Sequence, residues 1–330
     1  MIDLRKLTLE ISLLRAGYRT GDFTPAEVVR EIYRRIQERG EDHVWIHLRP
    51  EEEAVAIAEA SNRRLDLPLA GIPCAVKDNI DVAGMPTTAG CPDYAYVADR
   101  SAYAVKLLEE AGAIVIGKTN MDQFATGLVG TRSPYGACSS VYHPEFISGG
   151  SSSGSAVAVA AGLVSFSLGT DTAGSGRVPA AFNNIIGLKP TRGAISTSGV
   201  VPACRSLDCV SIFARVLDDA EKVLDFLISD DCGDPYSRQF ADRPLFARPF
   251  RFGVPNASQL DFCGDAAAAE LYDKAVARLI ALGGLPTEID LSPFREAASL
   301  LYGGPWVAER YAAVGKFIDS HPTSCDPTVA

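Results

Sequence analysis

Two serines of this chain, Ser151 and Ser175, each lie in a loop of small residues. The first loop, residues 149–155, reads GGSSSGS, and the second, residues 169–177, reads GTDTAGSGR. Small residues let backbone N–H groups approach a ligand closely and permit backbone angles that bulky residues resist. A serine hydroxyl beside such N–H groups supplies two parts of an acyl-transfer site, a nucleophile and an oxyanion hole. The missing part is a base.

Lys77 is the candidate base. It directly follows the apolar segment 73–76, which predicts an amine at the end of a buried strand. Burial disfavours the charged ammonium, so it lowers the pKa from about 10.4 and makes a neutral amine accessible. Judged by its position alone, Lys77 is better interpreted as a lysine that reaches water or pairs with Asp78 than as a base. Only the two serine loops favour the role of a base. The chain has four histidines, and their scarcity favours a lysine base.

Two other segments match the consensus sequences of known catalytic or phosphate-binding motifs. Residues 112–119 fit the phosphate-binding pattern G-x-x-x-x-G-K-[ST], but the variable positions are Ala-Ile-Val-Ile, which predicts a strand and not a phosphate-binding turn. Residues 150–154 fit the nucleophile elbow G-x-S-x-G around Ser152, which must follow a strand and needs a later histidine. The preceding segment is a poor strand, and only His321 lies downstream. Nucleotide hydrolysis and a serine–histidine triad are therefore disfavoured.

Segments of helical and strand length alternate along the chain. Thr24, Pro25 and Glu27 predict a capped helix start, and Gly40 ends the same helix. Further helices are predicted over residues 51–64, 101–111, 154–161, 218–228 and 266–282, and strands over residues 73–76, 113–116, 163–168, 251–254 and 287–291. This alternation predicts an α/β fold with a central mixed sheet. Residues 230–248 are interpreted as a loop or connection.

Composition excludes several classes of protein. Apolar residues make up 47% and charged residues 22% of the 330 residues, as in folded globular proteins. A net charge of -10 without a basic stripe argues against a nucleic-acid partner, and the chain has no long apolar run that predicts a membrane span. Early charges argue against a secretory signal, so a cytoplasmic location is expected. The eight cysteines form no C-x-x-C pair, and neither a metal nor a cofactor is expected.

Several segments together resemble the amidase signature family. They are residues 71–79 (GIPCAVKDN), 117–124 (GKTNMDQF), 149–155, 169–177 and 187–191 (GLKPT). The resemblance runs without a break over residues 66–220 and is far more specific than a single glycine motif. It implies the amidase signature fold, an α/β fold with a central mixed β-sheet flanked by helices on both faces. It also implies a hydrolase that acts on linear amide C–N bonds.

The resemblance assigns roles to the matching positions. Ser175 matches the nucleophile, Ser151 the bridging serine and Lys77 the lysine of a Ser–cis-Ser–Lys triad. The oxyanion hole matches the N–H groups of Thr172, Ala173, Gly174 and Ser175. The resemblance further implies a cis peptide bond between Gly150 and Ser151.

Within the family, residues 152–159, 174–179, 201–209 and 304–311 are similar to allophanate hydrolases. These enzymes release ammonia from allophanate, the carboxylated urea of urea and triazine breakdown. Their carboxylate-binding Tyr and Arg have the spacing of Tyr302 and Arg310, and Pro305 is predicted to open a helix with Arg310 in its second turn. Arginine binds a carboxylate through two parallel hydrogen bonds, so a small anionic amide is the expected substrate. A surface arginine and a core tyrosine are the alternative interpretation.

The resemblance predicts a single amidase domain over residues 1–330. It would comprise an N-terminal helical part (1–65), the signature core (66–220) and a substrate-side portion (221–330). Family domains usually run further than residue 330, so a fragment or a truncated chain is expected. Two alternatives stay open: another amidase, of the biuret, malonamate or amidotransferase A-like type, and an inactive or partner-dependent remnant. The sequence sets no oligomeric state, and a homodimer stays open.

Overall fold

The computed structural model describes residues 3–240 and 248–330. Contacts between Cα atoms divide the chain into two compact units. Unit 1 comprises Met1–Gln239 together with Arg310–Ala330, and unit 2 comprises Phe240–Glu309. The single domain over residues 1–330 stays a prediction.

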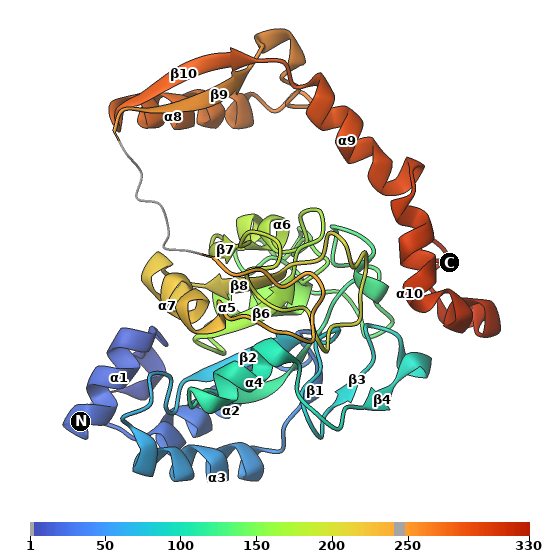
Figure 1. Ribbon diagram of the computed structural model, residues 1–330. Coiled ribbons are helices and arrows are strands. Elements are labelled where there is room, and N and C mark those ends of the chain that lie inside the picture. Colours follow the sequence, from blue (N-terminus) through green and yellow to red (C-terminus); the bar gives the residue numbers. More distant parts are fainter. Residues whose placement is uncertain (1–2, 241–247) are drawn as a thin grey trace. The chain divides into compact units, whose positions relative to one another are not determined.

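Unit 1 is built around a six-stranded mixed sheet (Figure 1). Its strands are β1 (Trp45–Leu48), β2 (Pro73–Lys77), β5 (Ile114–Thr119), β6 (Phe166–Thr170), β7 (Ile186–Leu188) and β8 (Val210–Ala214). Their order across the sheet is β1-β5-β2-β6-β8-β7. The three neighbours β5, β2 and β6 are parallel, whereas β1, β8 and β7 pair in the antiparallel sense. Because parallel strands end at the same edge, Lys77 and Thr170 lie at one edge of the sheet.

Helices flank this sheet. They are α1 (Ile11–Thr20), α2 (Pro25–Arg39), α3 (Glu51–Ser61), α4 (Tyr103–Glu110), α5 (Ser153–Ala160), α6 (Arg177–Phe182) and α7 (Leu217–Leu227). Helix α5 packs on β2, β5, β6 and β8, helix α3 packs on β5, and helix α7 packs on β7 and β8 (Figure 1). The predicted α/β architecture of a mixed sheet with flanking helices is confirmed.

Shorter elements complete unit 1. A two-stranded antiparallel sheet joins β3 (Pro86–Thr87) to β4 (Tyr96–Val97). The single-turn 3-10 helices are η1 (Leu4–Lys6), η2 (Asn62–Arg64), η3 (Pro92–Tyr94), η4 (Gln123–Ala125) and η6 (Pro322–Ser324). Helix α10 (Trp306–Ser320) enters unit 1 at Arg310.

The predicted start of α2 is confirmed in detail. Thr24 Oγ1 accepts a hydrogen bond from the Glu27 N–H at 3.3 Å, and Glu27 Oε2 accepts one from the Thr24 N–H at 2.8 Å. This reciprocal pair is a capping box, which satisfies two N–H groups that the helix itself leaves without partners. Pro25 occupies the first turn, where its missing N–H costs nothing.

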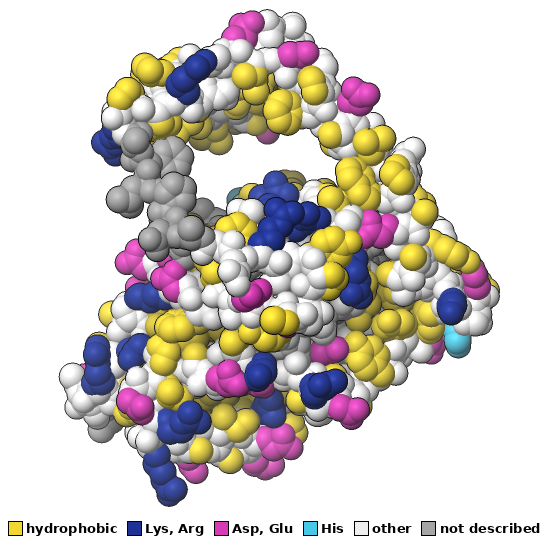
Figure 2. Space-filling model, in the orientation of Figure 1, with side chains coloured by type: hydrophobic (Ala, Val, Ile, Leu, Met, Phe, Trp, Pro, Cys, Tyr) yellow, Lys and Arg dark blue, Asp and Glu magenta, His cyan; other side chains and the backbone are white. Residues whose placement is uncertain are grey.

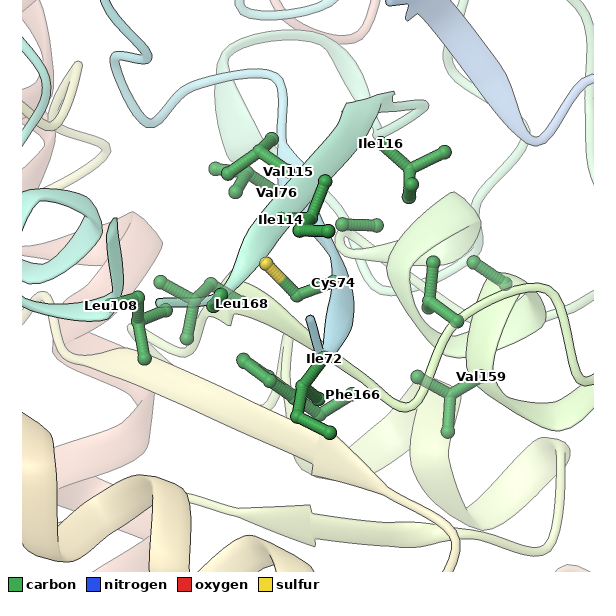
Figure 3. Packing of buried hydrophobic residues seen from close by; sticks show 14 of the residues in the cluster. Ile72, Cys74, Val76, Leu108, Ile114, Val115, Ile116, Val159, Phe166 and Leu168 are labelled. Carbon is green, nitrogen blue, oxygen red and sulfur yellow. The ribbon is translucent and has the colours of Figure 1, made fainter. Parts of the chain in front are cut away.

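The core lies between the central strands and α5. Cys74 and Val76 of β2, Phe166 of β6 and Val159 of α5 are fully or almost fully buried and pack together (Figure 3). Burial of each large apolar side chain contributes roughly 1.5–3 kcal/mol. All five residues of β2 are buried, because a central parallel strand is covered on both faces. The same cover removes Lys77 from water.

Unit 2 contains a parallel pair of strands joined by a helix. Strands β9 (Phe250–Pro255) and β10 (Gly284–Ile289) pair along their whole length, and α8 (Ala266–Ala281) connects them and packs on β10. The single-turn 3-10 helix η5 (Ala257–Gln259) follows β9, and α9 (Ser292–Gly303) follows β10. Large apolar side chains of this unit are exposed, among them Leu271, Leu285 and Phe294. Figure 2 shows hydrophobic side chains along the displayed face of unit 2.

All five predicted strands have somewhat different bounds in the structure, and β6 and β10 differ most at their starts. β6 begins at Phe166 and not at residue 163, because apolar composition does not mark where pairing starts. β10 begins at Gly284 and includes Pro286, which weakens the strand signal in the sequence. Proline is tolerated there because each strand of a two-stranded sheet has an unpaired side. Of the predicted connection 230–248, residues 241–247 lie outside the described residues.

Candidate active site

Lys77 ends β2 and is fully buried. Its Nζ donates to Ser151 Oγ at 2.8 Å and to Thr170 Oγ1 at 2.7 Å. Thr170 ends the neighbouring parallel strand β6, and the Asn79 amide also donates to its hydroxyl, at 3.4 Å. The sheet edge therefore fixes the amine between two hydroxyls.

Burial lowers the pKa of Lys77 to about 7, although the carboxylates of Asp122, Asp208 and Asp171 act in the opposite direction. The downward shift expected from a strand-end lysine is confirmed. Near neutral pH a substantial fraction of this amine is uncharged. An uncharged amine can donate to Thr170 while its lone pair accepts a proton from Ser151.

Ser151 lies just before α5 and is fully buried. The peptide bond between Gly150 and Ser151 is cis, as the resemblance implies. The Ser151 carbonyl accepts from the Asp122 N–H at 3.0 Å, and the Gly150 N–H donates to Leu128 O at 2.9 Å. A Cβ at position 150 would lie 2.2 Å from Asp122 Oδ2 and 2.5 Å from the Gly130 nitrogen, so only glycine fits.

Asp171 organises the loop that carries Ser175. Its Oδ1 accepts from the Gly174 N–H at 2.7 Å, and its Oδ2 accepts from the Gly176 and Arg177 N–H groups, each at 3.1 Å. The Arg177 guanidinium closes the ring with bonds of 2.9 and 3.0 Å to the same carboxylate. Burial alone would raise the pKa of Asp171, but the bonds and charge of Arg177 lower it below the ordinary value. A charged carboxylate thus holds the loop at its centre.

The N–H groups of the loop fall into two sets. The Gly174 N–H is committed to Asp171, whereas no hydrogen bond within the described residues uses the N–H groups of Thr172, Ala173 or Ser175. Thr172 is itself held from its side chain, which donates to Asp208 Oδ1 at 2.5 Å. Three of the four predicted oxyanion donors are therefore available to a ligand.

Ser175 is almost fully buried, and its loop lies against the Ser151 segment. Its carbonyl accepts from the Ser152 N–H at 3.3 Å. Its hydroxyl donates to Gly127 O at 3.5 Å, and no hydrogen bond joins it to Ser151 within residues 3–240 and 248–330. The structure therefore forms the predicted lysine–serine contact but not the predicted serine–serine contact.

Arg310 lies in the second turn of α10, as Pro305 predicts. Its Nη1 donates to Thr126 Oγ1 at 3.2 Å. Thr126 directly precedes Gly127, whose carbonyl accepts from the Ser175 hydroxyl. Tyr302 belongs to unit 2, lies in the last turn of α9 and is 60% exposed. Substrate binding by both residues stays a prediction.

The described residues contain no group of three or more His, Cys, Asp or Glu side chains that could hold a metal ion. Among these residues, none of the helices has the length and apolar character that a bilayer crossing requires.

A family model described as amidase matches residues 27–327. The chain belongs to the amidase family. The allophanate hydrolase of Kluyveromyces lactis superposes with a TM-score of 0.89 at 45% identity, over 99% of this chain and 54% of that one. This likeness extends the family assignment to the arrangement of sheet and helices.

Two curated relatives have different names and cover different shares of this chain. Urea amidolyase of Saccharomyces cerevisiae is 51% identical over 296 residues, which are 87% of this chain and 16% of that protein. Indoleacetamide hydrolase of Pseudomonas syringae is 39% identical over 217 residues, which are 65% of this chain and 47% of that protein. This amidase-family chain therefore spans about a sixth to a half of these two relatives.

Reasoning from the sequence missed three residues of this amidase-family site, namely Thr170, Asp171 and Asp208. Thr170 could have been found, because a threonine that ends a strand parallel to β2 must lie beside Lys77. Asp171 stands inside the second small-residue loop, but nothing in the letters shows that its carboxylate binds Gly174. Asp208 bonds Thr172 from 36 residues away, a contact that no local pattern predicts.

Proposed function

We propose that this chain is an amidohydrolase that releases ammonia from allophanate. The observation that carries the proposal is the 2.8 Å contact between Lys77 Nζ and Ser151 Oγ. It lies beside the loop of Ser175, in which the N–H groups of Thr172, Ala173 and Ser175 form no hydrogen bond within the described residues. A desolvated amine, a relaying hydroxyl and a second hydroxyl next to backbone donors are the parts that acyl transfer needs. The similarity to urea amidolyase and allophanate hydrolase supports this substrate.

In the first step Ser175 Oγ attacks the terminal amide carbon. The neutral Lys77 amine takes the Ser151 proton, and Ser151 takes the proton of Ser175. For this the Ser175 hydroxyl has to turn from Gly127 O toward Ser151 Oγ. The 3.5 Å contact with Gly127 is long for an O–H···O bond, so giving it up costs little.

The negative oxygen that forms next is stabilised by the N–H groups of Thr172, Ala173 and Ser175. The Gly174 N–H shapes the loop through Asp171 and does not face the oxyanion. The relay then returns the proton to the departing nitrogen, and ammonia leaves. Water attacks the acyl-enzyme through the same relay and frees Ser175. Removal of one oxyanion donor costs about 2.7–4 kcal/mol in comparable sites.

Arg310, with Tyr302, binds the carboxylate of the substrate in this proposal. The 3.2 Å bond from Arg310 to Thr126 supports the role of the arginine, because Thr126 adjoins the residue that contacts the nucleophile. A guanidinium pairs with a carboxylate through two parallel hydrogen bonds. A small anionic amide is thereby selected over a neutral one.

Two further parts of the proposal concern the setting of the enzyme. We propose a cytoplasmic location. The lack of disulfide bonds among the described cysteines supports it, because reducing compartments keep thiols from pairing. We keep the homodimer as the assembly to test by sedimentation. The proposed acyl transfer depends on neither the location nor the oligomeric state.

A substrate panel tests the function. Ammonia release is measured with allophanate, malonamate, biuret and a neutral amide of similar size, for the unchanged chain and for Ser175→Ala. The proposal expects turnover of allophanate that Ser175→Ala abolishes. Full turnover by Ser175→Ala would refute the nucleophile. Preference for a neutral amide would favour another amidase, to which the indoleacetamide hydrolase relative at 39% identity points. A monodisperse, folded chain without turnover would favour the inactive remnant.

A further inference from the structure

A hollow in unit 1 is lined by four arginines from three separate segments of the chain. Its volume is about 290 Å³. Arg5 belongs to η1, Arg34 and Arg35 belong to α2, and Arg215 directly follows β8. Like charges repel, so guanidinium groups that gather around one hollow are stabilised by carboxylate partners or by an anion between them.

The hollow lies at the edge of the sheet opposite to the proposed active site. Its lining residue Gly162 shortly precedes β6, and Arg215 follows Ala214, which pairs with Phe166 at the start of β6. Thr170, at the other end of β6, contacts the proposed base. The strand between these ends spans roughly 13 Å at about 3.3 Å per residue. A ligand in this hollow would therefore be distinct from the amide substrate.

Arg34 and Arg35 are fixed in place and already have carboxylate partners. Arg34 Nε donates to Glu31 Oε2 at 2.7 Å, and its Nη1 donates to Glu38 Oε1. Arg35 Nε donates to Glu31 Oε1 at 2.9 Å, and its Nη1 donates to Gly162 O at 2.8 Å. Two arginines and two glutamates thus form a neutral, ordered side of the hollow.

Arg5 and Arg215 carry the remaining charge. Both are exposed, and within residues 3–240 and 248–330 neither guanidinium forms an ion pair or a hydrogen bond. The lining residues and their ion-pair partners therefore have two surplus positive charges, in a chain whose net charge is -10. Each of these guanidinium groups has five N–H donors for a ligand.

The hollow also has open space and a further donor. A Cβ built on Gly162 would have only Arg35 Nη1 within 4 Å, at 3.5 Å. The hydroxyl of Thr8, another lining residue, forms no hydrogen bond in the part of the chain that the structure describes. A small anion therefore finds room, two unused guanidinium groups and an unused hydroxyl in one place.

We propose that this hollow binds a phosphate group through Arg5 and Arg215. A phosphate group carries close to two negative charges near neutral pH, which matches the two surplus charges, whereas one carboxylate carries a single charge. Its tetrahedral oxygens accept from donors that approach from different segments, and a guanidinium binds phosphate through two parallel hydrogen bonds. The source is inorganic phosphate or a small phosphate monoester. This site does not depend on the proposed function.

Exposed arginines that interact only with water are the competing explanation. Such arginines attract phosphate through the charge of the whole surface, so removal of any one of them would have the same small effect. A phosphate site instead predicts saturable binding that depends on Arg5 and Arg215 and not on other exposed arginines.

The test measures binding of inorganic phosphate to the full chain by calorimetry and phosphorus NMR, in a buffer without other multivalent anions. The unchanged chain should bind one phosphate ion saturably. Arg5→Gln and Arg215→Gln should each weaken binding roughly tenfold, because each removes a charged, two-pronged contact. Arg215→Lys keeps the charge without the planar fork and should bind with intermediate affinity. Arg63→Gln removes an equal charge from an exposed position of η2 and should bind like the unchanged chain.

Three outcomes would overturn the proposal. They are binding that does not saturate, an affinity that neither Arg5→Gln nor Arg215→Gln changes, and an equal loss in Arg63→Gln. Thermal unfolding without phosphate identifies a folding defect in either glutamine variant, and Arg215→Lys then carries the comparison. Because no turnover is needed, the result stands even if the chain releases no ammonia.

A second arm identifies the source of the phosphate group. Glycerol phosphate, a small monoester, is titrated into the same variants. Tighter binding of glycerol phosphate, with the same dependence on Arg5 and Arg215, would identify an organic phosphate as the ligand. Tighter binding of inorganic phosphate would identify the free ion. Either result supports the site, whereas binding of glycerol phosphate that is independent of both arginines contradicts it.

Discussion

The chemistry of single residues at this site follows from burial. Lys77 is fully buried at the end of β2, and its amine forms hydrogen bonds only to two neutral hydroxyls among the residues that the structure describes. Because the ammonium loses hydration without gaining a carboxylate partner, burial lowers its pKa to about 7. The lysine is thereby suited to accept a proton near neutral pH.

The first prediction concerns the pH dependence of turnover. Lys77 must be uncharged to accept a proton, so kcat/KM should be low at pH 5, rise through about pH 7 and level off above it. A pH–rate profile with allophanate or malonamate measures this. Lys77→Ala should lose nearly all turnover, with any remainder rising only at high pH. A profile that is flat between pH 5 and 9 would remove the lysine from the proposed relay.

The second prediction concerns Asp171, whose carboxylate receives the Gly174, Gly176 and Arg177 donors. Asp171→Asn replaces an acceptor with an NH2 group that opposes those donors. We expect a loss of roughly 1.5–3 kcal/mol in the free energy of unfolding, measured with urea. Turnover should fall as well, because the loop carries Ser175. Arg177→Met removes only the half-exposed guanidinium and should cost less, and the reverse order would contradict this view of the loop.

At the scale of elements, Gln123 and Phe124 of η4 help to attach the C-terminal segment to the signature core. Gln123 Nε2 donates to Ser324 O at 2.9 Å, and Gln123 Oε1 accepts from the Asp326 N–H at 2.7 Å. Next to it Phe124 contacts Phe317 of α10, with ring centroids 5.9 Å apart. The segment that carries Arg310 is therefore held by residues two to three positions before Thr126.

The third prediction follows from this attachment. Gln123→Leu removes both hydrogen bonds and should loosen residues 310–330, which hydrogen exchange would detect as faster amide exchange in α10. The KM for an anionic amide should rise, because Arg310 is then less ordered, while kcat for a neutral amide stays nearly unchanged. Gln37→Leu, at an exposed position of α2, is the matched control. Unchanged exchange in α10 would show that the aromatic contacts suffice.

Sequence patterns predict the elements with strong local signals and miss those without them. The capping residues of α2 and the apolar run before Lys77 identify their elements directly. Strand β8 escapes such reasoning because its short apolar run is typical of many buried segments, and α6 because Pro179 lies inside it. The left-handed backbone of Phe124 and Ala125, with φ of 49° and 54°, has no signal at all, since neither residue is glycine.

The site shows the same division. Lys77, Ser151 and Ser175 are identified by motif resemblance, and the strand-end position explains the lowered pKa of Lys77. That the Gly174 N–H is used by Asp171 could not be predicted, because four consecutive N–H groups look alike in a sequence. The position of the Ser175 hydroxyl could not be predicted either, because it depends on where the backbone of residues 127–130 lies relative to the serine loop.

At the scale of the molecule, the eight cysteines differ in how far their thiols are exposed to solvent. Five cysteines are buried, namely Cys74, Cys91, Cys138, Cys204 and Cys209, whereas Cys232 and Cys263 are exposed and Cys325 is half-buried. All eight belong to the described residues, and none of them is placed in a disulfide bond there. Because the cysteines lie in both units, the reactivity of their thiols tests whether each unit is folded.

The fourth prediction is a thiol titration. With an aromatic disulfide reagent, Cys232 and Cys263 should react rapidly in the native protein and Cys325 more slowly. The five buried thiols should react only on unfolding, because the reagent cannot reach them and burial also raises the pKa of Cys74, Cys91, Cys138 and Cys209. Cys232→Ser and Cys263→Ser together should remove the rapid phase. Rapid reaction of all eight thiols in buffer would mean that the chain is not folded as described.

The contact between the Ser175 hydroxyl and the Gly127 oxygen has a consequence for the idle protein. In that pose the proton points at a main-chain acceptor, away from the group that would activate it, so the oxygen is a poor attacker of chance electrophiles. At 3.5 Å this hydrogen bond is weak, and rotation about one torsion angle of the Ser175 side chain breaks it. A rotation of the Ser175 side chain, without any loop closure, therefore separates the unreactive position of its hydroxyl from the reactive one.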